Sequence, residues 1–184
     1  MDNGASSYRR FLSGDKTGMT EIVCAYTDGL IYFINSFVNN IDVSEELTED
    51  VFAVLIADKP RFNEKCTFKT WLFSIARNLA VSYIRRSAKI VDTPIDEMHN
   101  ISDGVSVENR YLKEEQRIML YEAISSLNSE YRHVLFLMYF EDFDTAETAR
   151  IMKKSKRQVG NLVYRAKQAL KKELERSGFV YEEL

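Results

Sequence analysis

The stretch from Asp144 to Leu174 combines residue types and spacings that suit DNA recognition. Between Arg150 and Lys172 the chain carries nine Lys or Arg residues and no Asp or Glu, although the whole protein has a net charge of −3. A phosphate backbone attracts such a local excess of cations. The stretch therefore predicts a DNA-binding surface, whose outward face carries Arg157, Asn161, Tyr164, Gln168 and Lys171. The alternative is a pair of ordinary surface helices with a solvated basic face.

Two helices joined by a tight turn must position these side chains. Asp144 with Glu147, and Ser155 with Gln158, each fit the capping-box pattern, so two helix starts lie eleven residues apart. The second helix has one apolar stripe with a period of 3.6 residues, formed by Val159, Leu162, Val163, Ala166, Leu170 and Leu174. A short helix, a turn and a long basic helix predict a helix-turn-helix whose second helix enters a major groove.

A second set of polar side chains lies on a predicted helix from Phe68 to Arg86. Trp71, Asn78 and Arg85 recur every seven residues and so share one direction along it. An aromatic ring, an amide and a cation in a row could stack on and hydrogen-bond an unpaired base. A half-buried Trp, a surface Asn and a solvated Arg are the alternative, and the local pattern leaves both open.

Four acidic residues crowd the start of a third predicted helix: Glu45, Glu46, Glu49 and Asp50. Asp42 and Glu45 fit a capping box there, and the helix dipole favours negative charge in the first turns. These acids are either a solvated face or a negative patch for a basic partner protein.

The composition predicts an all-α protein. Only seven Gly and two Pro occur among 184 residues. Residues 91–115 carry two basic and seven acidic side chains without an apolar stripe, which predicts an acidic flexible linker between two helical halves. Beyond it, Tyr131 to Phe140 is apolar almost all round, so this helix is expected to be buried, and His133 on it to be structural.

Several classes of function are not expected. Cys24 and Cys66 lack metal-ligand spacing and indicate reduced thiols in a cytoplasmic protein. The first residues lack the apolar core of a signal peptide, and the longest apolar run, Val134 to Phe140, is too short to cross a bilayer, so no membrane insertion is expected. We find no phosphate-binding glycine loop, no nucleophile with an adjacent base, and no catalytic, metal or cofactor site.

In order, these segments resemble a bacterial RNA polymerase sigma factor of the sigma-70 family, extracytoplasmic-function (ECF) type. SEELTEDVF at Ser44–Phe52 resembles region 2.2, which binds the clamp helices of the largest polymerase subunit. FKTWLFSIARNLAVSYIRR at Phe68–Arg86 resembles regions 2.3 and 2.4, which melt and read the −10 element. AISSLNSEYRHVLFLMYFEDFD at Ala123–Asp144 resembles region 4.1. The helix-turn-helix resembles region 4.2, which reads the −35 element.

The resemblance implies three sets of site residues. The −10 set is Phe62, Asn63, Lys65, Lys69, Trp71, Asn78 and Arg85, with Trp71 expected to pack and to assist melting. The −35 set is Lys154, Ser155, Lys156, Arg157, Gly160, Asn161, Tyr164 and Arg165. The polymerase-binding set is Glu45, Glu46, Glu49 and Asp50. The implied partners are core RNA polymerase, promoter DNA and an anti-sigma factor, and the protein is not itself an enzyme.

Three positions depart from the family pattern. Ser82 stands where Asp is usual, Lys153-Lys154 replaces the usual glycine-containing turn, and Gly160 stands where Lys or Arg is usual. A glycine inside a helix costs about 1 kcal/mol relative to Ala. It also removes the phosphate or base contact that Lys or Arg would make, so the −35 sequence read by this chain is expected to differ from the family's.

The predicted divisions are residues 1–88 for region 2, 89–113 for the flexible linker, 114–178 for region 4 and 179–184 for the tail. The expected fold is two small helical domains on that linker. Two other functions remain open from sequence: a stand-alone DNA-binding regulator that occupies an operator, and a helical adaptor that binds only proteins.

Overall fold

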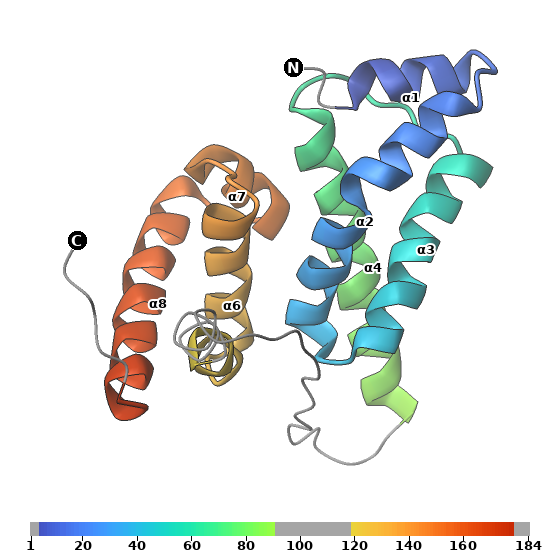
Figure 1. Ribbon diagram of the computed structural model, residues 1–184. Helices are drawn as coiled ribbons and strands as arrows, with labels where there is room; N and C mark the ends of the chain where they lie inside the picture. Colours follow the sequence, from blue (N-terminus) through green and yellow to red (C-terminus); the bar gives the residue numbers. More distant parts are fainter. Residues whose placement is uncertain (1–3, 91–118, 179–184) are drawn as a thin grey trace, which may run out of the picture.

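The computed structural model describes residues 4–90 and 119–178, and every regular element in these ranges is a helix (Figure 1). The N-terminal unit consists of α1 (Ala5–Leu12), α2 (Thr17–Val38), α3 (Ile41–Ala57) and α4 (Phe68–Ile90). The all-α prediction is confirmed. Among the described residues, none of the helices combines the length and the apolar character that a membrane crossing requires.

The start of α3 differs from the predicted capping box at Asp42. Asn40 is the N-cap, and its side-chain oxygen accepts a hydrogen bond from the Val43 amide at 3.1 Å. The preceding residue, Asn39, adopts a left-handed conformation (φ 49°) that ends α2. This Asn-Asn pair therefore ends one helix and begins the next. Asp42 lies inside the first turn, where its charge still favours the helix dipole.

Helix α4 lies against both α2 and α3, which explains why it is apolar on two sides. Its two apolar faces, represented by Leu72 and Phe73, are both fully buried. The core of this unit also includes Tyr8, Leu30, Phe33, Ile34, Val51, Leu55 and Phe68. Each such side chain contributes roughly 1.5–3 kcal/mol on burial.

The C-terminal unit contains helical residues 119–125, α6 (Ser129–Leu135), a π-helix η1 (Phe136–Phe140), α7 (Thr145–Met152) and α8 (Lys156–Arg176). The predicted uniformly buried helix over 131–140 is wrong in its second half. There the backbone widens into the π-helix. Two of its apolar rings point outward, because Tyr139 is 51% exposed and Phe140 is 43% exposed.

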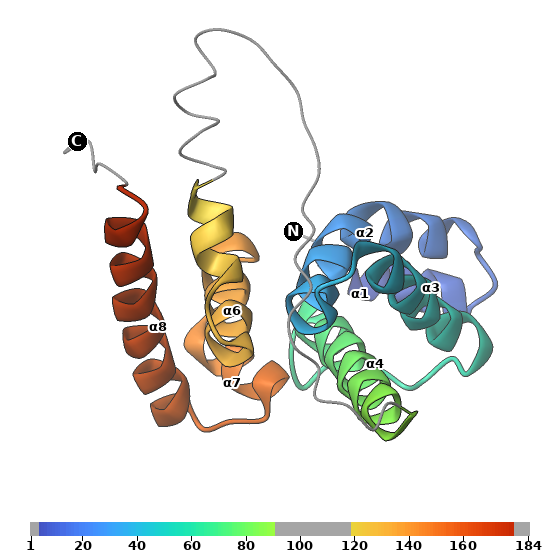
Figure 2. The same ribbon diagram turned by 90° about the horizontal axis from the view of Figure 1, so that it is seen from below.

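The two units pack directly on one another. In two views at right angles, α6 and α7 lie beside the α1–α4 bundle and α8 lies on the far side of them (Figures 1 and 2). Aromatic rings cross the boundary: Phe33 stacks on Phe136 with ring centroids 6.1 Å apart, and Phe73 meets Phe143 edge-on at 5.1 Å. A single apolar core therefore runs through both units.

A buried histidine also joins the two units. His133 is 7% exposed, stacks on Phe37 with centroids 3.5 Å apart, and forms a hydrogen bond with the Ser36 carbonyl at 3.1 Å. The neighbouring Arg132 guanidinium donates to the same carbonyl at 3.3 Å. Burial lowers the pKa of His133 from 6.5 to about 3, and the positive charges of Arg132 and Arg77 add to that effect. The imidazole is therefore neutral at physiological pH.

Candidate nucleic-acid interface

Both predicted capping boxes between Asp144 and Gln158 are present. The Asp144 carboxylate accepts from the Glu147 amide at 2.8 Å, and the Glu147 carboxylate accepts from the Asp144 amide at 3.2 Å. Ser155 and Gln158 form the same reciprocal pair at 3.2 and 2.8 Å. Each pair satisfies two backbone donors that a helix start leaves free. The helix-turn-helix prediction is confirmed at the level of its local hydrogen bonds.

Lys153 makes the turn that a glycine usually makes. Its backbone is left-handed, with φ 55° and ψ 43°. The Lys154 amide donates to the Ala149 carbonyl at 2.9 Å and the Lys153 amide to the Arg150 carbonyl at 3.3 Å, which is the bond pattern of a Schellman motif. A non-glycine residue pays about 1–2 kcal/mol for this conformation, and the two bonds and the flanking caps offset that cost.

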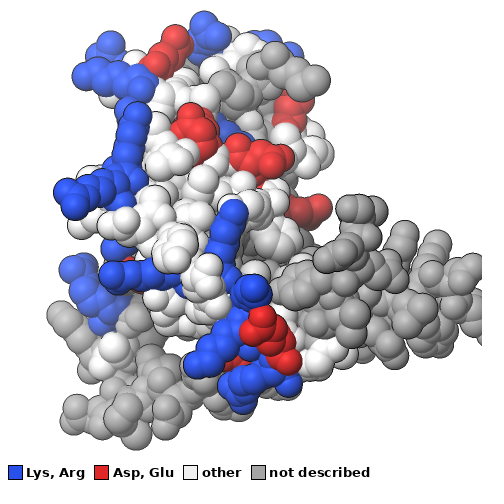
Figure 3. All heavy atoms as spheres, turned by 90° about the vertical axis from the view of Figure 1, so that its left-hand side faces the viewer, with Lys and Arg blue, Asp and Glu red and all other residues white. Residues whose placement is uncertain are grey.

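The face of α8 opposite its buried stripe is open to solvent. Val159, Leu162, Ala166 and Leu174 are buried as predicted. The exposed set contains most of the predicted −35 residues, with Tyr164 67% exposed: Lys156, Arg157, Gly160, Asn161, Tyr164 and Arg165. On the side of the molecule where α8 lies, Lys and Arg side chains outnumber acidic ones (Figure 3).

Two of the predicted −35 residues, Ser155 and Lys154, have local roles in this structure, whereas a third, Gly160, has none. The Ser155 hydroxyl is used as the N-cap of α8, and the Lys154 ammonium pairs with Glu130 at 2.7 Å. Gly160 is exposed, and a Cβ added there would meet nothing within 4 Å. Inside the free protein, therefore, no contact requires a glycine at this position.

The loop over residues 59–67 is anchored by an aromatic cluster. Phe62 lies 5.2 Å from Trp71 and 5.7 Å from Phe68, measured between ring centroids. Tyr8 on α1 completes the cluster, 5.5 Å from Trp71, and its hydroxyl donates to the Pro60 carbonyl at 2.8 Å. Trp71 is half-buried by these contacts. It is therefore held by packing, which leaves only part of the ring open.

The polar residues of this loop point outward. The Asn63 side chain accepts from the Lys65 amide at 3.2 Å, and both residues are exposed. Asn78 and Arg85 are also exposed, but they lie further along α4. Ten and seventeen residues beyond Phe68 correspond to about 15 and 26 Å of helix. The structure thus brings Phe62 together with Trp71, while Asn78 and Arg85 occupy separate levels of the same helix.

Lys69 points towards the C-terminal unit. Its ammonium lies 2.8 Å from the Glu141 carboxylate and donates to the Glu141 backbone carbonyl at 2.8 Å. It also lies over the Phe143 ring, 4.8 Å from the centroid. Gly29 makes room for this pair, because a Cβ there would lie 2.6 Å from a Glu141 carboxylate oxygen. In this arrangement the Lys69 ammonium is bound between the two units.

The acidic face of α3 is exposed. Glu45, Glu46, Glu49 and Asp50 all lie on the solvent side, opposite buried residues such as Leu47, Val51 and Leu55. No ion pair within the described residues neutralises any of the four. The face is therefore available to a basic partner.

Comparison with known families assigns the two units. Residues 22–90 match the family model described as Sigma-70 region 2, and residues 117–170 match the one described as Sigma-70, region 4. The chain belongs to the sigma-70 family. It is an ECF sigma factor, and directs transcription initiation through these two regions. Helices α3 and α4 belong to region 2, and α6 and α7 to region 4.

Similar proteins cover nearly the whole of this sigma factor. The ECF sigma factor SigW of Bacillus subtilis is 25% identical over 170 residues, covering 88% of this chain and 91% of SigW. The ECF sigma-E factor of Escherichia coli is also 25% identical over 170 residues, with 88% of each chain covered. Two solved structures share the fold: CnrH in complex with the cytosolic domain of CnrY (TM-score 0.64, 19% identity, 95% and 96% coverage), and RpoE in complex with the anti-sigma factor NepR from Bartonella quintana (TM-score 0.65, 21% identity, 85% and 96% coverage).

Sequence reasoning missed the residues that join region 2 to region 4. The Glu147 carboxylate, besides capping α7, accepts hydrogen bonds from the hydroxyls of Thr67 at 3.0 Å and Thr70 at 2.9 Å. Together with the Lys69 contact to Glu141, these bonds fix the start of α4 against the entry to the helix-turn-helix. The partners are more than 70 residues apart, so no local pattern indicates them. The capping-box position of Glu147 was the one available signal.

Proposed function

We propose that this sigma factor reads the −10 element with its N-terminal domain and the −35 element with its helix-turn-helix. The exposed basic face of α8 is the observation that carries this proposal. Hydrogen bonds fix the turn between α7 and α8 on both sides. Helix α8 therefore presents that face rigidly, as docking in a major groove requires. The domain assignment that goes with it is residues 1–88, linker 89–113, region 4 over 114–178 and tail 179–184.

The −35 reading rests on the first three turns of α8. The exposed Arg157 and Asn161 have the side chains that most often read guanine and adenine edges, each by two parallel hydrogen bonds. Lys156 and Arg165 add charge for the phosphates, and Tyr164 adds an exposed ring. Ser155 and Lys154 add to the −35 surface, Lys154 once its ion pair with Glu130 has been exchanged for a contact with phosphate.

The −10 reading rests on the loop at 59–67 and on α4. Phe62, Asn63 and Lys65 offer a ring, an amide and a cation at one level, and Asn78 and Arg85 continue the surface along the helix. Capture of a flipped base offsets part of the melting cost, which is a few kcal/mol per base. Trp71 packs against Phe62 and so supports this loop. Lys69 becomes part of the −10 surface once region 4 has moved away from region 2.

Region 4 must separate from region 2 for both elements to be bound at once. The two promoter elements are centred roughly 25 base pairs apart, which is about 85 Å of DNA at 3.4 Å per pair. Helix α8, the longest helix among the described residues of region 4, has 21 residues and spans only about 32 Å. The packed arrangement with Lys69 bound to Glu141 is therefore the arrangement of the free protein, and the promoter-bound arrangement is more extended.

The acids of α3 are proposed to bind core RNA polymerase. Four carboxylates on one helix, without an ion pair among the described residues, attract a basic surface and orient the approach, which mainly accelerates association. An anti-sigma factor is a further proposed partner, supported by the fold shared with RpoE in its complex with the anti-sigma factor NepR. We further propose that the protein acts in the cytoplasm, where the free thiols of Cys24 and Cys66 stay reduced.

Co-purification tests this function against the two alternatives. A tagged full-length chain should retain core RNA polymerase at physiological salt, whereas an operator-binding regulator or a protein-only adaptor should not. Nanomolar binding of an operator by the isolated chain, without retention of polymerase, would contradict the proposal and favour the regulator.

A further inference from the structure

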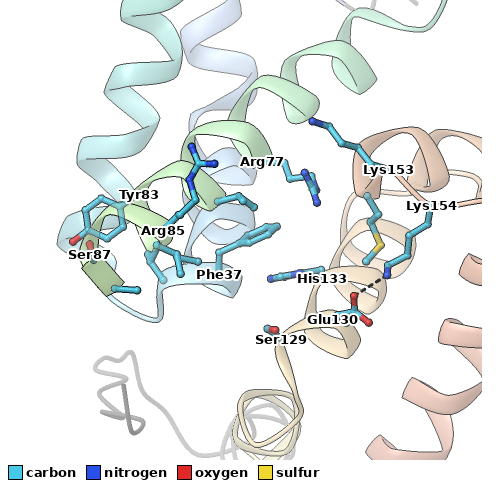
Figure 4. Close-up of a pocket in the computed structure, with 15 residues that line it drawn as sticks. Phe37, Arg77, Tyr83, Arg85, Ser87, Ser129, Glu130, His133, Lys153 and Lys154 are labelled. Carbon is cyan, nitrogen blue, oxygen red and sulfur yellow. Dashed lines mark ion pairs between the residues drawn. The ribbon is translucent and has the colours of Figure 1, made fainter. Parts of the chain in front are cut away.

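A cleft of about 760 Å³ lies between region 2 and region 4 (Figure 4). One wall is formed by the end of α2 and the C-terminal half of α4, and the other by the start of α6 and the turn of the helix-turn-helix. Its volume falls within the range of about 300–1,000 Å³ that is usual for small-molecule sites. Arg85 and Lys154 at its edges belong to the surfaces assigned above to the −10 and −35 elements, but Arg77, His133 and Lys153 belong to none of those surfaces.

The cleft has an excess of positive charge. Arg77 and Arg85 line it from region 2, and Lys153 and Lys154 line it from region 4, against a single carboxylate, Glu130. Glu130 is already paired with Lys154 at 2.7 Å. The other three cations have neither an ion pair nor a side-chain hydrogen bond within the described residues.

Arg77 and Lys153 line opposite walls of this cleft. In Figure 4 the Arg77 side chain comes from α4, and the Lys153 side chain comes from the turn and extends towards α4. Arg77 is half-buried, and that burial lowers the pKa of its guanidinium below the usual value. A partly buried cation without a counter-charge is costly, and the exposed Lys153 on the other wall adds a second positive charge to the same cleft. An anion bound by both side chains would supply the missing counter-charge.

The rest of the lining is aromatic or apolar. Phe37 and the neutral His133 stack on each other at one side, and Tyr83, Val81 and Met152 line other parts. Ligand sites commonly combine such walls with a few convergent polar groups. The lining thus suits a ligand that has an anionic end and a flat apolar end.

We propose that this cleft binds a small phosphate-bearing ligand of the nucleoside di- or triphosphate class, held between Arg77 on α4 and Lys153 in the turn. The shared chemistry is the pyrophosphate group, for which the guanidinium offers a planar fork of donors and the ammonium a point charge. Because the two cations belong to different regions, the site exists only while the regions are packed together. By linkage, the ligand stabilises this arrangement and opposes the extended one that promoter binding requires.

Calorimetric titration of the full-length chain tests the proposal. The probes are inorganic pyrophosphate and ATP, at fixed ionic strength, with the melting temperature followed in parallel. The test variants are Arg77→Gln and Lys153→Asn, since Asn tolerates the left-handed backbone at that position. The matched control is Arg86→Gln, which removes an exposed cation of α4 that does not line the cleft.

We expect saturable binding of at least one probe, a higher melting temperature on binding, and a Kd at least tenfold weaker in each test variant but unchanged in the control. Equal affinity for the two probes would identify phosphate as the recognised group. Tighter binding of ATP would show that the apolar walls also contact the ligand. The proposal is overturned if neither probe binds, or if Arg86→Gln weakens binding as much as Arg77→Gln. Duplex DNA is titrated in parallel, and the proposal is equally overturned if only DNA binding is weakened in the test variants, because the cations then contact a nucleic-acid backbone.

Discussion

Acidification should weaken the fold of this protein through His133. The folded protein holds its pKa near 3, against 6.5 for an ordinary histidine. The unfolded chain therefore binds a proton between pH 6.5 and 3 that the folded chain does not. Stability is fully present above pH 6.5 and falls as the pH is lowered through this window. The expected loss is about 1 kcal/mol at pH 6 and about 2 kcal/mol at pH 5, relative to pH 7.5.

Urea denaturation followed by circular dichroism measures this loss. Full-length wild type and His133→Gln are compared at pH 7.5, 6 and 5 and constant ionic strength. The glutamine amide can still donate to the Ser36 carbonyl but does not titrate. The carboxyls of Asp15 and Glu21 also have shifted pKa values, but both are lowered from values below 5 by hydrogen bonds to Thr17 and Arg10 respectively, so they titrate largely below this range.

The wild type should lose about 2 kcal/mol more than the variant between pH 7.5 and 5. Equal losses in the two proteins would show that His133 is not a buried neutral group. A variant with lower stability at pH 7.5 is expected and does not decide the matter; only the difference in pH dependence does.

Three variants test the proposed surfaces. Reversing Glu46 and Asp50 to Lys should reduce retention of core polymerase without loss of helicity, and unchanged retention would remove α3 from that interface. Asn78→Ala should lower open-complex formation on duplex promoters, with only the melting part rescued on a pre-melted template; permanganate footprints equal to wild type would make Asn78 an ordinary surface amide. Gly160→Ala should raise stability by up to about 1 kcal/mol, because its Cβ meets nothing within 4 Å. Weaker −35 binding despite that gain would indicate close approach of the backbone to DNA, normal binding would mean that glycine is merely tolerated, and a less stable variant would contradict the structure around it.

The helix-turn-helix was predictable because its signals are local. Each capping box spans four residues, and the stripe of α8 follows one period, so the sequence specifies both helix starts and the buried face. Local signals also compete, however. Asn40 and Asp42 are both good N-caps, and the structure uses the earlier one, which satisfies the donors directly after the left-handed turn at Asn39.

The packing of region 4 on region 2 was not predictable from local patterns. Lys69 contacts Glu141 across 72 residues, and Thr70 contacts Glu147 across 77. On a helix wheel Lys69 is simply a polar residue, and nothing in its neighbourhood indicates a partner. The run from Phe136 to Phe140 was misjudged for a related reason: apolar composition predicts burial, but the π-helix turns Tyr139 and Phe140 outward.

Transcription in vitro shows most directly whether this chain directs initiation at specific promoters. Core RNA polymerase, genomic fragments and nucleotides are combined with and without the full-length chain, and transcript starts are mapped. Transcripts from a limited set of promoters should appear only when the chain is present, each start lying downstream of shared −10 and −35 sequences. Core polymerase that gains no promoter-specific starts from the chain, while the chain alone occupies specific DNA sites, would contradict it.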